Sequence, residues 1–218
     1  MISKTPMLKP FVLATLTALA GTAQAGLTTY SSQASFLAAV TSPGVDTFTG
    51  LSITGSTPSP ITRTAGSYSY TAAVSTTSFF GAGTTADPWL STNTATDSIT
   101  FNGFSGGVSA IGGLFFGSNI SGLFAAGDVT LTVTDSLGAT LTQTITGATT
   151  SSFLGFTSTG TITSLVLSSV QPASGFLWPT TDNLTLAIAT PVPEAETYAL
   201  LLSGLGVLGL VARRRRTS

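Results

Sequence analysis

Asp128-Val-Thr-Leu-Thr-Val-Thr134 is the stretch of this sequence that indicates the fold class most directly. Its apolar residues alternate with polar ones, which is the two-residue period of a strand with one buried face. A second stretch of the same kind, Ala139–Thr146, follows after Asp135-Ser-Leu-Gly138, whose residue types favour a turn. The three segments together predict an antiparallel hairpin.

Segments with similar patterns lie on both sides of this hairpin. We expect further strands at 68–74, 98–101, 108–116, 152–156, 162–168 and 184–188. Turn residues separate them at intervals of about ten residues, which is typical of antiparallel sandwiches and barrels. The fold class predicted for residues 26–190 is therefore all-β, an antiparallel β-sandwich of the jelly-roll type.

One short helix is expected before these strands. Apolar residues at helical spacing, Phe36 among them, predict a helix over Gln33–Val40 that Ser42-Pro43-Gly44 ends. The polar stretch Leu51–Gly66 is interpreted as a mobile loop.

Residues 1–25 have the pattern of a secretory signal peptide. Lysines precede the apolar segment Phe11–Ala20, and small residues stand at Ala23 and Ala25, the two positions that a signal peptidase reads. Cleavage after Ala25 would give a mature chain that begins at Gly26. The sequence therefore predicts export, with signal peptidase as a partner.

The end of the chain carries an apolar run and then a basic cluster. Residues 197–212 contain no charged side chain. Four arginines follow: Arg213, Arg214, Arg215 and Arg216. Tyr198–Ala212 would reach roughly 22 Å as a helix, a little less than the ~30 Å hydrocarbon core of a bilayer. Because arginines cluster at the cytoplasmic end of a span, we predict a transmembrane helix at 197–212 and a cytoplasmic tail at 213–218, with a buried core helix as the alternative.

A short linker joins the predicted domain to this run. Residues 191–196 should be extended, because each proline disfavours helix in the residue before it, and they include Pro193, Glu194 and Ala195. The order of tripeptide, apolar span and terminal arginine cluster resembles the PEP-CTERM sorting signal of Gram-negative bacteria. The resemblance covers residues 192–216, and Ala195 stands where a second proline is expected.

The resemblance implies that a membrane enzyme, an exosortase, recognises the tail and cleaves near the tripeptide. The protein would pass through the inner membrane and end at the cell surface or outside the cell, in bacteria that make exopolysaccharide. The layout of residues 26–190 also resembles other domains that carry this tail, which implies a β-sandwich linked to carbohydrate or surface attachment.

Composition excludes several functions for residues 26–190. The sequence has no histidine and no cysteine, so the common hydrolase triads and most zinc sites are absent. Arg63 is the one basic residue of this region against six aspartates, which gives a net charge of minus five and excludes nucleic acid as a partner. We predict a noncatalytic domain that needs no cofactor.

Two groups of residues are candidates for binding. Trp89 and Trp178 adjoin prolines in expected loops, where rings stack on sugars; the alternative is that each ring plugs an end of the sandwich. Asp46 lies near the first strand and Asp182 and Asn183 near the last, so they could meet and supply oxygens to calcium.

Three functions stay open at this point. The first is a structural or adhesive surface protein associated with exopolysaccharide or biofilm, and the second is a carbohydrate-binding module. The third is a glycoside hydrolase that uses two aspartates, one as acid and one as base or nucleophile.

Overall fold

The computed structural model describes residues 26–76, 78–190, 201, 203–206, 208 and 213. We call residues 26–190 the β-domain; they lie within one of the two compact units of the chain. The described C-terminal residues are helical, and no helix among the described residues is long and apolar enough to cross a membrane. Several predicted features lie outside the described residues: the signal peptide with Ala23 and Ala25, the tripeptide Pro193, Glu194 and Ala195, most of the predicted span, and Arg214, Arg215 and Arg216.

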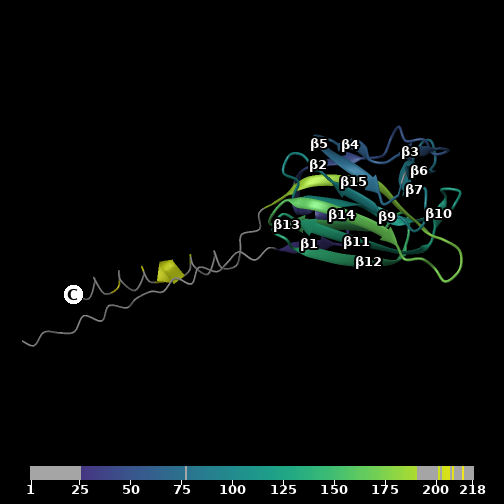
Figure 1. The fold of residues 1–218 in the computed structure, drawn as a ribbon. Helices are drawn as coiled ribbons and strands as arrows, with labels where there is room; N and C mark the ends of the chain where they lie inside the picture. The colour runs from purple at the N-terminus through teal and green to yellow at the C-terminus, as the bar shows by residue number, and fades with distance from the viewer. Residues whose placement is uncertain are drawn as a thin grey trace, which may run out of the picture. The chain divides into compact units, whose positions relative to one another are not determined.

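Two antiparallel sheets make up the β-domain (Figure 1). Sheet A has the strand order β1 (Leu27–Tyr30), β13 (Phe153–Ser158), β9 (Ala110–Ser118), β15 (Trp178–Ala189), β7 (Pro88–Thr92), β6 (Ser78–Gly83) and β3 (Ser56–Pro58), with β10 (Phe124–Ala125) paired to β9 and β2 (Val40–Asp46) paired to β15. Sheet B has the order β12 (Thr140–Ala148), β11 (Gly127–Asp135), β14 (Ile162–Ser169), β8 (Ile99–Asn102), β5 (Tyr68–Val74) and β4 (Ile61–Ala65). The pairings confirm the predicted all-β, antiparallel class.

The hairpin β11–β12 forms as its alternation predicts. Leu131 and its apolar neighbours on β11 are fully buried, whereas the threonines between them face outward. There Thr132 and Thr142 lie opposite each other, with their hydroxyl oxygens 2.9 Å apart. Leu131 belongs to the same core cluster as Phe115 of sheet A, so the apolar faces of the two sheets share one core.

The helix α1 (Gln33–Ala38) is shorter than predicted. Val40 already belongs to β2, where it pairs with Ala189, and the expected stop at residues 42–44 lies inside the same strand. Phe36 packs with Ala110 of β9 in a small second core cluster, so α1 covers sheet A on the face away from sheet B. The prediction was wrong at its C-terminal end because strand pairing with β15, far away in sequence, overrides local helical spacing.

The interpretation of Leu51–Gly66 as a loop was also wrong. This stretch contains β3 and β4, and β4 pairs with β5 along its whole length. Strands β6 and β7 were not predicted at all. The short alternations in these segments are hard to recognise among so many serines, threonines and glycines.

Both ends of the β-domain lie at the same end of sheet A. Thr28 of β1 pairs with Thr157, Thr157 pairs with Ala110, and Ala110 pairs with Ala187 near the end of β15. These residues form one row across the sheet. The first residue of β15, Trp178, therefore lies at the opposite end of the sheet.

Candidate functional site

The candidate site lies on the face of sheet A that points away from sheet B. Thr180 of β15 pairs with Ser91 of β7, and Ser91 pairs with Phe80 of β6. Residues that pair across strands share one face of a sheet, so these three side chains point the same way. Their sequence neighbours Phe79 and Leu90 point into the core, which places the row on the outer face.

Three buried hydroxyl groups form the floor of this site. The Thr180 hydroxyl donates to Ser118 Oγ at 2.7 Å and lies 3.0 Å from Ser91 Oγ. Ser91 in turn donates to the Pro179 carbonyl oxygen at 3.2 Å. The floor is therefore polar, uncharged and hydrogen-bonded within itself, which fixes the positions of its side chains.

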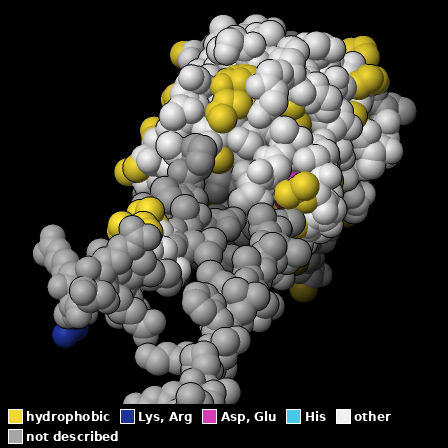
Figure 2. Space-filling model, turned by 90° about the vertical axis from the view of Figure 1, so that its left-hand side faces the viewer, with side chains coloured by type: hydrophobic (Ala, Val, Ile, Leu, Met, Phe, Trp, Pro, Cys, Tyr) yellow, Lys and Arg dark blue, Asp and Glu magenta, His cyan; other side chains and the backbone are white. Residues whose placement is uncertain are grey.

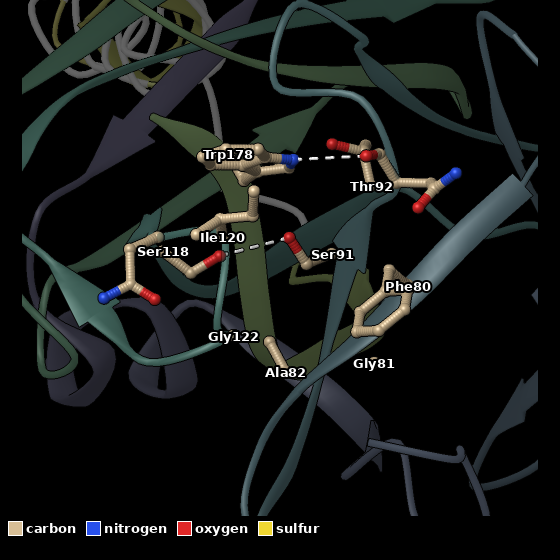
Figure 3. Close-up of a pocket in the computed structure, with 11 residues that line it drawn as sticks. Phe80, Gly81, Ala82, Ser91, Thr92, Ser118, Ile120, Gly122 and Trp178 are labelled. Carbon is tan, nitrogen blue, oxygen red and sulfur yellow. Dashed lines mark hydrogen bonds between the residues drawn. The ribbon is translucent and has the colours of Figure 1, made fainter. Parts of the chain in front are cut away.

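The connection between β9 and β10 forms one wall. Asn119 Oδ1 accepts hydrogen bonds from the backbone N–H groups of Ser121 and Leu123, which holds a tight turn. The Gly83 N–H donates to the Gly122 carbonyl at 2.8 Å and fastens the turn to β6. The result is a pocket of about 220 Å³, with Ile120 at its rim. In Figure 3, Trp178 lies beside Ile120 on one side of this pocket.

Trp178 is held in place from several directions. Its indole N–H donates to the Asn93 carbonyl at 3.4 Å, and its ring lies edge to face with Phe176 at 6.2 Å between centroids. Leu177, the residue between them in the sequence, is buried, and Gln171 holds its backbone by accepting from its N–H and donating to its carbonyl oxygen. The ring is therefore positioned at the pocket before any ligand arrives.

The two tryptophans do not form one site. Trp89 lies within β7, not in a loop, and packs edge to face on Phe116 at 4.8 Å between centroids. Its indole N–H donates to Asp87 at 3.2 Å, and the ring packs against the main core. Trp178 likewise begins a strand, but it lines the pocket, whereas Trp89 does not. Sequence reasoning missed Ser91 and Phe80 because β7 and β6 were not recognised, and it missed Ser118 because the strand predicted at 108–116 ended before that residue.

Asp46 lies at the centre of a second polar cluster. Its carboxylate accepts from Arg63 Nε and Nη2, both at 2.7 Å, from the Tyr70 hydroxyl at 2.8 Å and from the Phe48 N–H at 2.8 Å. Burial, together with the nearby Asp46 charge, raises the pKa of Tyr70 well above its ordinary value. Burial alone would lower the pKa of Arg63, but Asp46 raises it above its ordinary value. The cluster is a partly buried, hydrogen-bonded ion pair.

The strands of the three candidate calcium ligands are neighbours, as expected. Asp46 pairs with Leu184, two residues beyond Asp182. The Asp182 carboxylate accepts from the backbone N–H of Asn183 at 2.7 Å and from its side-chain amide at 2.8 Å. The described residues contain no group of three or more acidic, histidine or cysteine side chains placed to hold a metal. Arg63 takes both Asp46 oxygens, and calcium binding stays a prediction.

The ionisation of Asp182 should make stability depend on pH. Burial raises the pKa of Asp182 to about 6, above the value of about 4 expected in the unfolded chain. The folded state therefore binds more protons between these values, so this residue's contribution to stability is lost as pH rises from about 4 to 6. In Asp182→Asn, whose side chain does not ionise, the fall in melting temperature between pH 4.5 and 7.5 should shrink by about 2–4 °C. Circular dichroism melts measure this, and equal falls in both proteins would contradict the prediction.

Residues 191–216 match the PEP-CTERM protein-sorting motif. The chain carries a PEP-CTERM sorting tail. The match includes Pro193, Glu194, Ala195 and the arginine cluster, and it confirms the resemblance seen in the sequence. No curated protein and no solved structure matches the chain.

The PEP-CTERM tail implies export and membrane-associated sorting, with an exosortase as the processing enzyme. The motif begins directly after Thr190, the residue that follows β15 by one position. The pocket lies at the other end of β15, beside Trp178. The segment that sorts the protein and the candidate site are therefore attached to opposite ends of one strand.

Proposed function

We propose that this chain is an exported, noncatalytic protein whose tail an exosortase processes, and whose β-domain then serves at the cell surface or in the extracellular matrix. The β-domain is a jelly-roll-like sandwich with a structural or adhesive role in association with exopolysaccharide or biofilm. The observation that carries the proposal is the match of residues 191–216 to the PEP-CTERM motif.

The placement of the aspartates supports a noncatalytic role. Each of them accepts hydrogen bonds from its own surroundings: Asp46, Asp87, Asp97, Asp128, Asp135 and Asp182. A hydrolase needs two carboxylates facing each other across a substrate site. The residues around the Trp178 pocket include no aspartate. The visible face of the β-domain in Figure 2 is mostly uncharged, with scattered apolar side chains, as suits a domain among neutral polymers.

Mass spectrometry of the protein from a Gram-negative host with an exosortase tests this function. We expect the chain recovered outside the inner membrane to begin at Gly26 and to end near Pro193. Replacement of Arg213, Arg214, Arg215 and Arg216 by glutamine should leave the chain uncut, because the arginine cluster is part of the matched sorting motif.

Two controls make the result specific. Thr217→Ala changes the residue after the arginine cluster and should be processed normally, and a host without the exosortase should leave the wild-type chain uncut. A wild-type chain that keeps Ser218 and stays in the inner membrane of the exosortase-containing host would show that the proposed sorting is wrong.

A further inference from the structure

We propose that the pocket beside Trp178 binds a neutral hexose residue of a polysaccharide, with the indole ring as the surface on which the sugar stacks. This inference rests on the proposed function, because only an exported domain meets such polymers. It names one site and one class of ligand within that function, and it assigns no such role to Trp89.

Large apolar side chains are exposed around this pocket. Phe176 is 66% exposed and Ile120 is 80% exposed, and both lie next to the half-buried Trp178. Aromatic rings at a water-facing site offer a flat apolar surface and keep a polar edge for hydrogen bonds. A sugar ring has the matching shape, with C–H groups on its faces and hydroxyl groups around its edge.

The polar groups of the pocket are all uncharged. Hydroxyl and amide side chains, such as Ser118, Asn93 and Asn119, line it together with the apolar residues. Asn119 uses its side-chain oxygen within the turn, so its amide nitrogen is the group placed to donate to a ligand. A charged ligand would find no opposite charge among the lining residues, whereas sugar hydroxyls would find donors and acceptors.

The pocket is rigid and small. The Trp178–Asn93 hydrogen bond and the hydrogen bonds of Gln171 to the Leu177 backbone hold the indole ring in place. Binding therefore loses little conformational entropy from ordering this ring. A volume of about 220 Å³ is below the range typical of sites for drug-sized ligands, which favours one sugar residue at a time.

The position of the site on the strand suits a tethered or displayed protein. β15 spans Trp178–Ala189, which is about 35–37 Å at the usual rise per strand residue. A surface that holds the protein by its C-terminal end therefore holds the end of the strand that is far from the pocket. The pocket lies beside Trp178, at the other end of this strand.

Binding of purified full-length protein to neutral hexose oligomers tests the inference. The probes are cellohexaose, maltohexaose and mannohexaose, with polygalacturonate as an acidic comparison, measured by calorimetry and tryptophan fluorescence. We expect the protein to bind at least one neutral oligomer. We expect it to bind polygalacturonate no more tightly than that neutral oligomer. Trp178→Ala should weaken this binding at least tenfold, and Phe176→Ala, which removes an exposed ring, should weaken it severalfold.

Trp89→Phe is the matched control, because it changes the other tryptophan and leaves Trp178 as the sole indole. This variant should bind as the wild type does, and its fluorescence should still respond to the oligomer. Melting temperatures of all variants separate lost binding from lost folding. Failure of the wild type to bind any neutral oligomer, or unchanged binding in both Trp178→Ala and Phe176→Ala, overturns the inference. If the tail is cut but no oligomer binds, this inference is wrong and the proposed function is unaffected. If an oligomer binds but the tail is not cut, the proposed sorting by an exosortase is wrong and the sugar site is unaffected.

Discussion

Asp46→Ala is expected to destabilise the β-domain by about 3 kcal/mol, because it leaves a partly buried cation without its partner. Asp46 is 5% exposed and the Arg63 side chain 17% exposed. The substitution removes both carboxylate contacts of the guanidinium and the acceptor of the Tyr70 hydroxyl. Urea unfolding at pH 7 should show the loss as a lower midpoint with an unchanged slope.

The size of this effect follows from where the cluster lies. Asp46 ends β2 of sheet A, whereas Arg63 lies in β4 and Tyr70 in β5 of sheet B. The cluster therefore joins the two sheets by hydrogen bonds at one edge of the shared core. Arg63 also lies 5.3 Å from the centroid of the Phe48 ring, so the cation has an aromatic contact, and Asp46 is its one carboxylate partner among the described residues.

Two further variants separate this cause from a general loss of charge. Asp128→Ala removes an aspartate whose carboxylate accepts a hydrogen bond from the exposed Gly147 N–H at 2.8 Å, and it should cost less than about 1 kcal/mol. Arg63→Met combined with Asp46→Ala should cost much less than the sum of the two single changes, because the unpaired cation is then absent. Additive costs would contradict the partly buried ion pair as the cause.

Local patterns predicted those elements whose signal lies within one segment. The strand Tyr68–Val74 was predicted with the bounds that the structure has, and its burial alternates at every residue. The hairpin of β11 and β12 was predicted for the same reason. The sequence placed Trp178 in a loop, which was wrong because it begins β15, and its role as a binding residue stays a prediction.

Elements that depend on distant partners were missed or misplaced. β2 begins at Val40 because β15 pairs with it, and nothing near Val40 in the sequence signals this pairing. The hydroxyl floor of the pocket was missed because Ser91 and Thr180 are buried by contacts across strands. In a chain rich in serine and threonine, residue type alone does not distinguish a buried hydroxyl from an exposed one.

Gly44→Ala should be as damaging as the loss of Asp46, because two backbones meet at this residue. A Cβ atom on Gly44 would lie 2.2 Å from the Ala65 carbonyl oxygen and 3.0 Å from the Gly66 Cα. Both atoms belong to the backbone, so no side chain can rotate away, and β2 would have to move from the end of β4. We expect a cost of about 3 kcal/mol in urea unfolding, at the upper end for an added methyl group.

Gly55→Ala is the matched control for this change. Its Cβ would lie 3.3 Å from Ser52 Oγ, a side-chain atom that can turn aside, so the cost should stay below about 1 kcal/mol. Gly44 is two residues before Asp46, and Ala65 is two residues after Arg63. Gly44→Ala and Asp46→Ala therefore both weaken the same contact region between β2 and β4. The costs of Gly44→Ala and Asp46→Ala should therefore combine to less than their sum. Equal stability of Gly44→Ala and Gly55→Ala would mean that this close approach does not constrain how the sheets join.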